Sequence, residues 1–207
     1  SYNSIGNVYF HSGDYIRALE YYQQSLVTLE EESADYQHNI AALYQCIGCV
    51  YEAQAQYNKA LEYFQKALAI HKQIFGESHP NVAMAYHYIG KVYNDQSNYN
   101  LALEYYQLAL VINTHTYGDM HPNVASLHND VGTICEAQAQ YNQALEHYQK
   151  ALCIDKQIFG ELHPELATVY NNIGMIYSNQ GNYNLALEYY QKALVINTHI
   201  YGESHPA

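Results

Sequence analysis

Cys46 and Cys49 form the local motif with the clearest potential for chemistry. Two thiols three residues apart on a helix point to the same side, so they could supply half of a zinc site. His87, on a later predicted helix, could complete a Cys-Cys-His cluster if equivalent helices stack side by side. A structural zinc site needs four ligands, however, and no second CxxC pattern occurs, while Cys135 and Cys153 occupy expected packing positions. We therefore predict no metal site, and expect the cysteines to pack internally or to line a groove.

No other part of the sequence carries a catalytic pattern. HExxH, GxSxG, GxGxxG and phosphate-loop motifs are all absent. Six of the twelve histidines recur at equivalent positions: four in His-Pro dipeptides, and His115 and His199 in a shared Asn-Thr-His. Because a recurring residue is usually structural, we expect the His-Pro histidines to cap helices. The sequence thus predicts a protein that is not an enzyme and needs no cofactor.

The charge balance excludes two classes of partner. Eight Lys and Arg oppose twenty Asp and Glu, giving a formal net charge of −12. Nucleic acids and anionic membranes are bound through clustered basic residues, so neither is an expected partner. No apolar run is long enough to span a membrane, and no signal-peptide pattern opens the sequence. Four cysteines are too few for a disulfide scaffold, which favours a cytoplasmic location.

The sequence is an internal repeat. The four His-Pro dipeptides are spaced by 42 residues each time, and the copies align without a gap. Alternate copies are the most similar, which indicates duplication of a pair. We therefore predict a single array over residues 1–207 with no linker. Its repeats span residues 1–38, 39–80, 81–122, 123–164 and 165–206.

Each repeat has the pattern of two amphipathic helices. Apolar residues recur at i, i+3, i+4 and i+7 in both halves of the repeat 81–122, on either side of Asn98. Each His-Pro should begin a first helix, because the first position of a helix needs no N–H donor and so accommodates proline. Asp14, Asn98 and Asn182 are suited to cap second helices. Glycines before each His-Pro should end the second helices with a positive φ: Gly76, Gly118, Gly160 and Gly202.

A recurring glycine inside each first helix predicts a close helix–helix approach. Glycine costs ~1 kcal/mol relative to alanine in a helix, so a packing reason is expected. We expect the recurring alanine of the second helix, such as Ala102 opposite Gly90, to face it. The recurring tyrosines, including the paired ones such as Tyr105-Tyr106, should pack within and between repeats and not stack on a ligand.

These positions carry a known signature. The pattern resembles the tetratricopeptide repeat over essentially the whole chain. It consists of an aromatic residue followed by x-x-aliphatic-Gly-x-x-Tyr, and then of Tyr-x-x-Ala-x-x-x-aromatic-x-x-Ala. The 42-residue period and the Phe/Tyr-Gly-x-x-His-Pro junction are similar to those of kinesin light chains. The repeat 123–164 departs from the signature at His128 and Cys135, and the repeat 1–38 departs at Ser25 and in Glu30-Glu31-Glu32-Ser33. The resemblance implies an all-α, alpha-alpha superhelix (a solenoid) of about five helix-turn-helix repeats.

The resemblance also implies a concave groove, lined by the first helices, that binds a peptide or protein segment. Beside the core positions the first helices carry a second stripe, which differs between near-identical repeats while the scaffold stays the same. We predict that it binds the partner; the alternative is drift of a solvated surface. We call these residues the groove stripe: Asn3, Asn7, Gln45, Cys49, Glu52, His87, Lys91, Asn94, Asn129, Asp130, Thr133, Glu136, Asn171, Asn172, Met175 and Ser178.

The groove stripe favours a neutral to basic peptide. Its Asn and Gln side chains both donate and accept hydrogen bonds, which suits the backbone of an extended peptide. Lys91 is opposed by Glu52, Asp130 and Glu136, so the stripe is net acidic. It therefore lacks the basic set with which chaperone-tail clamps and light-chain grooves of the resembling family hold acidic peptides.

Two alternatives to a peptide-binding scaffold remain open at this point. No polar capping helix is evident at either end, so the array could be structural or self-associating, head to tail between molecules. It could also be an accessory module of a larger protein.

Overall fold

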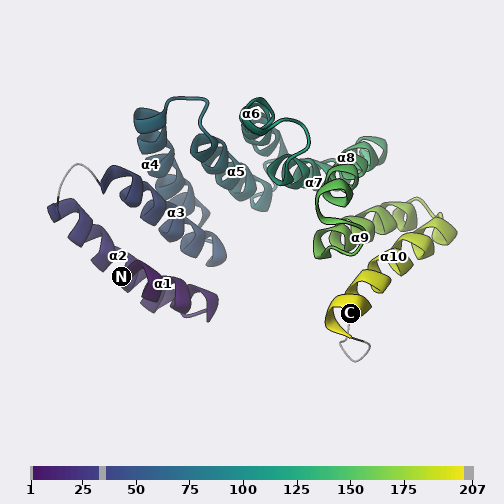
Figure 1. The fold of residues 1–207 in the computed structure, drawn as a ribbon, viewed down its shortest axis with the longest axis horizontal. Helices are drawn as coiled ribbons and strands as arrows, with labels where there is room; N and C mark the ends of the chain where they lie inside the picture. Colours follow the sequence, from purple (N-terminus) through teal and green to yellow (C-terminus); the bar gives the residue numbers. More distant parts are fainter. Residues whose placement is uncertain (1, 33–35, 203–207) are drawn as a thin grey trace. The chain divides into compact units, whose positions relative to one another are not determined.

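The computed structural model describes residues 2–32 and 36–202, and within these ranges every regular element is a helix. Each repeat contributes a first and a second helix, so odd-numbered helices are first helices and even-numbered ones are second helices (Figure 1). The predicted all-α helical-repeat fold is confirmed. The elements are α1 (Tyr2–His11), α2 (Tyr15–Glu32), α3 (Gln37–Ala53), α4 (Tyr57–Phe75), α5 (Pro80–Asp95), α6 (Tyr99–Tyr117), α7 (Pro122–Ala137), α8 (Tyr141–Phe159), α9 (Pro164–Asn179) and α10 (Tyr183–Tyr201).

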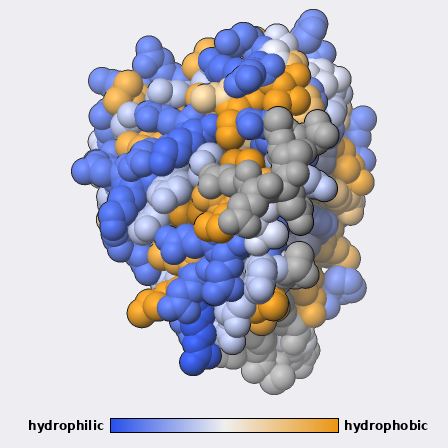
Figure 2. Space-filling view, turned by 90° about the vertical axis from the view of Figure 1, so that its left-hand side faces the viewer, coloured by the Kyte–Doolittle hydropathy of each residue, from blue (hydrophilic) through white to orange (hydrophobic). Residues whose placement is uncertain are grey.

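The helices form two compact parts, residues 1–112 and residues 113–207. Within each part, a first helix packs on the second helix of its own repeat, and a second helix also packs on the next first helix. First helices of neighbouring repeats also touch, α1 with α3 in the N-terminal part and α7 with α9 in the C-terminal part. Viewed from the left of Figure 1, the surface is mostly hydrophilic with separate hydrophobic areas (Figure 2).

The His-Pro junctions are helix caps, as predicted. The Nδ1 atoms of His79, His121 and His163 each accept a hydrogen bond from the backbone N–H two residues later, and the following proline occupies the first turn. Each imidazole also stacks on the aromatic residue that ends the preceding helix, for example Phe159 on His163 with ring centroids 4.1 Å apart. The preceding glycines have the expected positive φ, between 81° and 83°.

Two predictions about second-helix caps had different outcomes. Asp14 accepts a hydrogen bond from the backbone N–H of Arg17, so it caps α2 as expected. The prediction for Asn182 is wrong, because its side chain makes no capping bond to α10. The predicted helix start at His205-Pro206 and the departure at Ser33 lie outside the described residues.

The glycine of each first helix makes room for an aromatic ring. A Cβ added to Gly48 would lie 2.5 Å from Phe64, and one added to Gly90 would lie 2.7 Å from the Tyr106 ring and 3.3 Å from the carbonyl oxygen of Ala102. The close approach is therefore correct, but the nearest group is the aromatic ring and not the alanine side chain. Equivalent ring contacts occur at Gly6, Gly132 and Gly174.

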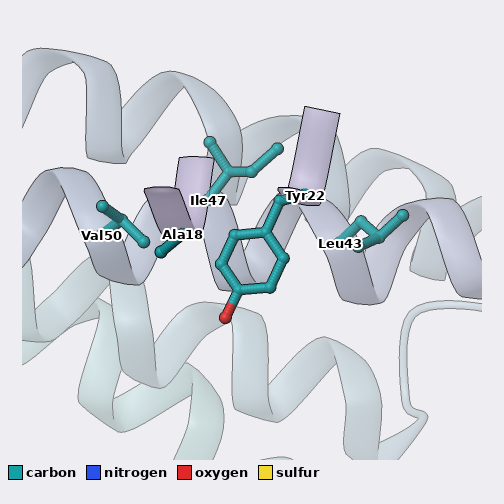
Figure 3. Close-up of a cluster of buried hydrophobic side chains, with 5 residues drawn as sticks. All are labelled: Ala18, Tyr22, Leu43, Ile47 and Val50. Carbon is teal, nitrogen blue, oxygen red and sulfur yellow. The ribbon is translucent and has the colours of Figure 1, made fainter. Parts of the chain in front are cut away.

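These rings build a core between consecutive helix pairs. In the N-terminal part, Tyr22 from α2 lies among Ala18, Leu43, Ile47 and Val50, all at most 1% exposed (Figure 3). Phe64 of α4 occupies the same place one repeat later and stacks on Tyr88 of α5, with ring centroids 5.1 Å apart. Tyr22 and Phe64, each the second residue of an aromatic pair, thus pack between repeats, whereas Tyr190 in the last repeat is 37% exposed.

The first residue of each aromatic pair packs within its own repeat. Tyr63, for example, lies between Tyr44 and Tyr51 of α3, with ring centroids 5.8 Å and 5.5 Å away. The repeat 123–164 departs from this arrangement, because His128 and His147 stand at the positions that correspond to Tyr44 and Tyr63. Their Nδ1 atoms are 3.0 Å apart and their ring centroids are 5.2 Å apart, so a hydrogen bond is added to the ring contact.

Candidate peptide-binding surface

The groove stripe is divided between the two parts of the molecule. α1, α3 and α5 carry its first eight residues, and α7 and α9 carry the other eight. Most of these side chains are half-buried, as expected for a surface between adjacent helices. Asn7, Lys91, Asn171 and Met175 are exposed. Gln45 differs, because it is only 8% exposed and its buried Nε2 has no hydrogen-bond partner.

In the N-terminal part, the stripe residues of α3 and α5 meet through an ion pair. Nζ of Lys91 lies 2.6 Å from Oε1 of Glu52, whose side chain is only 10% exposed. Burial lowers the pKa of Lys91, but the hydrogen bond and charge of Glu52 outweigh it, so that this pKa is raised. The lysine of the stripe is thus held by a carboxylate of the stripe, and it offers little free positive charge to an acidic ligand.

The stripe residues of α1 are joined to α3 through a core tyrosine. The Tyr22 hydroxyl donates a hydrogen bond to Oδ1 of Asn7, 2.6 Å away, and it also interacts with the thiol of Cys46. Burial raises the pKa of Tyr22 well above its ordinary value. The hydroxyl therefore stays protonated, and it can hold the Asn7 amide in one orientation.

The two thiols of α3 are poorly suited to metal ligation or nucleophilic attack. Burial raises the pKa of both, that of Cys49 to about 12, with the Glu52 carboxylate as a further cause. The thiolate is the reactive and metal-binding form, so these groups stay in the unreactive state at neutral pH. Among the residues that the structure describes, no three His, Cys, Asp or Glu side chains are grouped to hold a metal ion, so the Cys46–Cys49–His87 cluster does not form.

In the C-terminal part, amides connect the stripe between α7 and α9. Nδ2 of Asn172 donates to Oδ1 of Asn129 over 3.2 Å. Further along α7, the Thr133 hydroxyl donates a hydrogen bond to the Asp130 backbone carbonyl. The Tyr148 hydroxyl of α8 donates one to the carboxylate of Glu136. Burial raises the pKa of Glu136, although the bond from Tyr148 opposes this. The stripe here is a hydrogen-bonded polar surface and not a set of separate solvated side chains.

The C-terminal part also has an acidic cavity that the sequence interpretation missed. Its volume is about 280 Å³, and its lining includes Ser126 and Asn129 of α7, Asp155 and Phe159 of α8, and Glu165 of α9. Asp155 is only 6% exposed. Burial, together with the Glu165 carboxylate, raises the pKa of Asp155 to about 6, while His163 opposes the shift.

A comparison of the repeats could have revealed Asp155. The equivalent positions hold Leu29, His71, Asn113 and Asn197, so a position in the core of the second helix varies in polarity. The groove stripe lies on first helices, and the second helices of alternate repeats are closely similar elsewhere, so one varied position on a second helix does not stand out from the sequence pattern.

These features define the class of protein: an array of paired helices whose first helices present a varied polar surface on a repeated aromatic core. The chain belongs to the tetratricopeptide repeat family. A family model described as tetratricopeptide repeat matches residues 1–73, 39–112 and 81–157, and a second with the same description matches residues 166–207. A search of curated proteins gave no significant match.

Several solved structures share this fold. BtubC (BKLC) from P. vanneervenii is 22% identical with a TM-score of 0.82, covering 98% of this chain and 80% of that one. A kinesin light chain-like protein of Podospora anserina with nearly identical TPR-like repeats is 18% identical with a TM-score of 0.75, covering 97% and 95%. The repeats of this chain therefore resemble those of kinesin light chains.

A Rap protein complexed with competence and sporulation factor is also similar. It is 18% identical with a TM-score of 0.79, covering 95% of this chain and 53% of that one. At these identities the likeness concerns the fold. Together with membership of the family, the fold supports a protein-interaction scaffold as the class of function. None of the described helices is both long and apolar enough to cross a membrane.

Proposed function

We propose that the chain is a non-catalytic scaffold that binds an extended peptide or protein segment along the groove stripe. The observation that carries this proposal is the set of bridges between first helices, Glu52 to Lys91 and Asn129 to Asn172. Such bridges hold polar side chains in fixed positions on an accessible surface, and preorganised groups bind a ligand at lower entropic cost. The structurally similar Rap protein complexed with competence and sporulation factor supports a protein or peptide partner.

The charges of this surface favour a neutral to basic partner. In the N-terminal part, Lys91 is already paired with Glu52. In the C-terminal part, the first helices α7 and α9 carry Asp130, Glu136 and Glu165 and have neither Lys nor Arg. An acidic segment would therefore meet like charges along α7 and α9. A cytoplasmic location is part of this proposal, as is the exclusion of nucleic acid, since the net charge is −12.

The test is a peptide-display selection on the wild-type chain beside a groove variant, His87→Ala, Lys91→Ala, Asn129→Ala and Asn171→Ala. The matched control changes four exposed glutamines of the second helices, Gln65→Ala, Gln107→Ala, Gln149→Ala and Gln191→Ala. We expect a shared neutral or basic motif with wild type and with the control, and its loss with the groove variant. Equal enrichment on all three folded proteins would contradict the groove, and selection of acidic peptides would contradict the charge preference.

A second candidate function, head-to-tail self-association, is supported by the end helices. On α4, Tyr57, Leu61 and Leu68 pack against a core cluster that includes the fully buried Ile89 and Val92 of α5. The residues of α10 that correspond to this side of the interface are exposed. They are Tyr183 (66%), Leu187 (58%) and Leu194 (53%).

The opposite end offers the complementary half of this interface. Ile5 and Val8 of α1 correspond to the buried Ile89 and Val92, yet they are 41% and 68% exposed. α1 of one molecule could thus dock on α10 of another in the manner of α5 on α4, which is a heterologous contact. Sedimentation should show mass increasing with concentration, and Val8→Glu or Leu187→Glu should abolish the increase. A monomeric mass at every concentration would eliminate this candidate.

A further inference from the structure

We propose that the acidic cavity between α7, α8 and α9 is a subsite that takes an arginine side chain of the bound segment. This inference rests on the proposed peptide-binding function and specifies one contact within it. The cavity lies beside the groove stripe, because Asn129 belongs to both. A residue of a segment lying on α7 and α9 could therefore reach into it from the stripe.

Asp155 places a carboxylate in the lining of the cavity. Only 6% of the surface of Asp155 is exposed, and Glu165 lines the same cavity. The lining includes neither lysine nor arginine. The imidazole of His163 also lines the cavity and partly offsets the charge of Asp155, but burial and the Glu165 carboxylate outweigh it. A buried carboxylate whose charge is only partly offset is costly, and a cation entering the cavity would remove much of that cost. A positively charged side chain in this cavity would therefore lower the cost of burying Asp155.

Both carboxylates are departures from the repeat pattern. Asp155 stands where the closely similar repeat 39–80 has His71, and Glu165 stands where other repeats have Asn39, Asn81 and Asn123. The two positions are ten residues apart, on different helices, yet both changes add a negative charge to the same cavity. Random drift of a surface gives no reason for two acidic changes to converge on one cavity, whereas binding of a cation does.

The remaining lining favours guanidinium over ammonium. Guanidinium is more weakly hydrated and forms forked hydrogen bonds to carboxylates, which suits a site with two carboxylates and the polar side chains of Ser126 and Asn129. The Phe159 ring also lines the cavity and offers apolar surface to the aliphatic stem of an arginine. Its stacking on His163 holds the ring in place. The volume of about 280 Å³ accommodates an arginine side chain more fully than a small ion.

The experiment is an NMR titration of the full chain with the capped peptide acetyl-Ala-Ala-Arg-Ala-Ala-amide. Matched peptides carry citrulline, which has the shape of arginine without its charge, or lysine. We expect saturable shifts of backbone amides at residues 123–129 and 155–165 with the arginine peptide. Affinity should fall at least tenfold with citrulline and several-fold with lysine. Equal affinity for arginine and citrulline, or shifts centred elsewhere, would overturn the proposal.

Two variants test whether the carboxylates are responsible. Asp155→Asn places in the cavity the residue that the chain itself uses at 113 and 197, so the variant should stay folded, and Glu165→Asn copies positions 39, 81 and 123. We expect each variant to weaken the arginine peptide at least fivefold, while Glu188→Gln, on the exposed surface of α10, should leave the affinity unchanged. An unaltered affinity in folded Asp155→Asn would refute the subsite.

The subsite and the groove can fail separately. If the peptide selection depends on the groove variant but shows no preference for arginine, and the capped peptide does not bind, the groove stands and the subsite is wrong. If the arginine peptide binds at Asp155 while selection is indifferent to the groove variant, the cavity is a cation site and the extended groove is wrong.

Discussion

His71 gives the sharpest test of the physical reasoning, because it is a buried polar residue in a position where the chain also uses leucine. It is 1% exposed, and neither of its ring nitrogens has a hydrogen-bond partner. Burial, followed by the positive charges that His38 and His79 would carry, lowers the pKa of His71 to about 4. The equivalent residue of the first repeat is Leu29. We therefore predict that His71→Leu stabilises the fold.

The magnitude has two parts. At pH 7.5 the substitution removes two unsatisfied polar atoms, which is worth about 1–3 kcal/mol. The stabilisation by His71→Leu increases at acidic pH. The pKa of His71 in the folded chain lies below that of the unfolded chain, so the unfolded state binds the proton first as the pH falls, and wild type loses stability from about pH 6.5 towards pH 4. At ~1.4 kcal/mol per pKa unit, the loss is about 1 kcal/mol at pH 5.5 and about 3 kcal/mol at pH 4.

The assay is urea denaturation followed by circular dichroism at pH 7.5, 5.5 and 4.5, on wild type, His71→Leu and the control His115→Leu, which changes an exposed histidine. The lowered pKa values of His128 and His147 add to the acid sensitivity of all three proteins equally, so they cancel in the differences. A stability difference that does not grow as the pH falls would refute the reasoning about burial. So would destabilisation by His71→Leu at pH 7.5.

Three further predictions concern the scaffold, and urea denaturation at pH 7.5 measures each of them. Gly48→Ala should destabilise by about 2 kcal/mol, since its Cβ would lie 2.5 Å from the fully buried Phe64 ring; an unchanged midpoint would contradict the tight contact. Ala139→Gly should stabilise by roughly 0.5–1 kcal/mol, because Ala139 has φ of 57°; a loss of stability would count against backbone strain there. Asp14→Ala should cost about 1 kcal/mol through loss of the α2 cap, with Asp14→Asn retaining most of the stability; equal losses in both variants would exclude capping as the cause.

The sequence predicted the scaffold well because its constraints are local and repeated. At the His-Pro junctions the proline fixes a helix start, and the glycine a few residues earlier fixes the end of the preceding helix. The junctions therefore follow from residue type alone. The loops inside the repeats were less predictable, since Ala55, Ser97 and Ala139 adopt positive φ, which non-glycine residues rarely do. In these loops the packing of the helix pair imposes the backbone conformation against the preference of the residue.

The candidate site was harder to predict, because a helical stripe indicates which side a residue occupies but not how deep it lies. Gln45 and Lys91 both belong to the groove stripe, yet Gln45 is almost fully buried, and the side chain of Lys91 is 53% exposed. Depth depends on the neighbouring helix, which no periodicity within a single repeat describes. The same limit concealed Asp155, whose neighbours across the cavity come from α7 and α9.

What the repeats do provide is an internal comparison. Positions that vary between near-identical copies while the packing around them stays the same are free of the demands of the fold, so their variation reflects either drift or function. Drift predicts changes scattered over exposed positions. Asp155 and Glu165 instead lie together, one of them almost fully buried, where a charge is expensive. A change that is costly to the fold and aligned with a second change on another helix is better explained by a ligand than by drift, and the arginine titration decides between them.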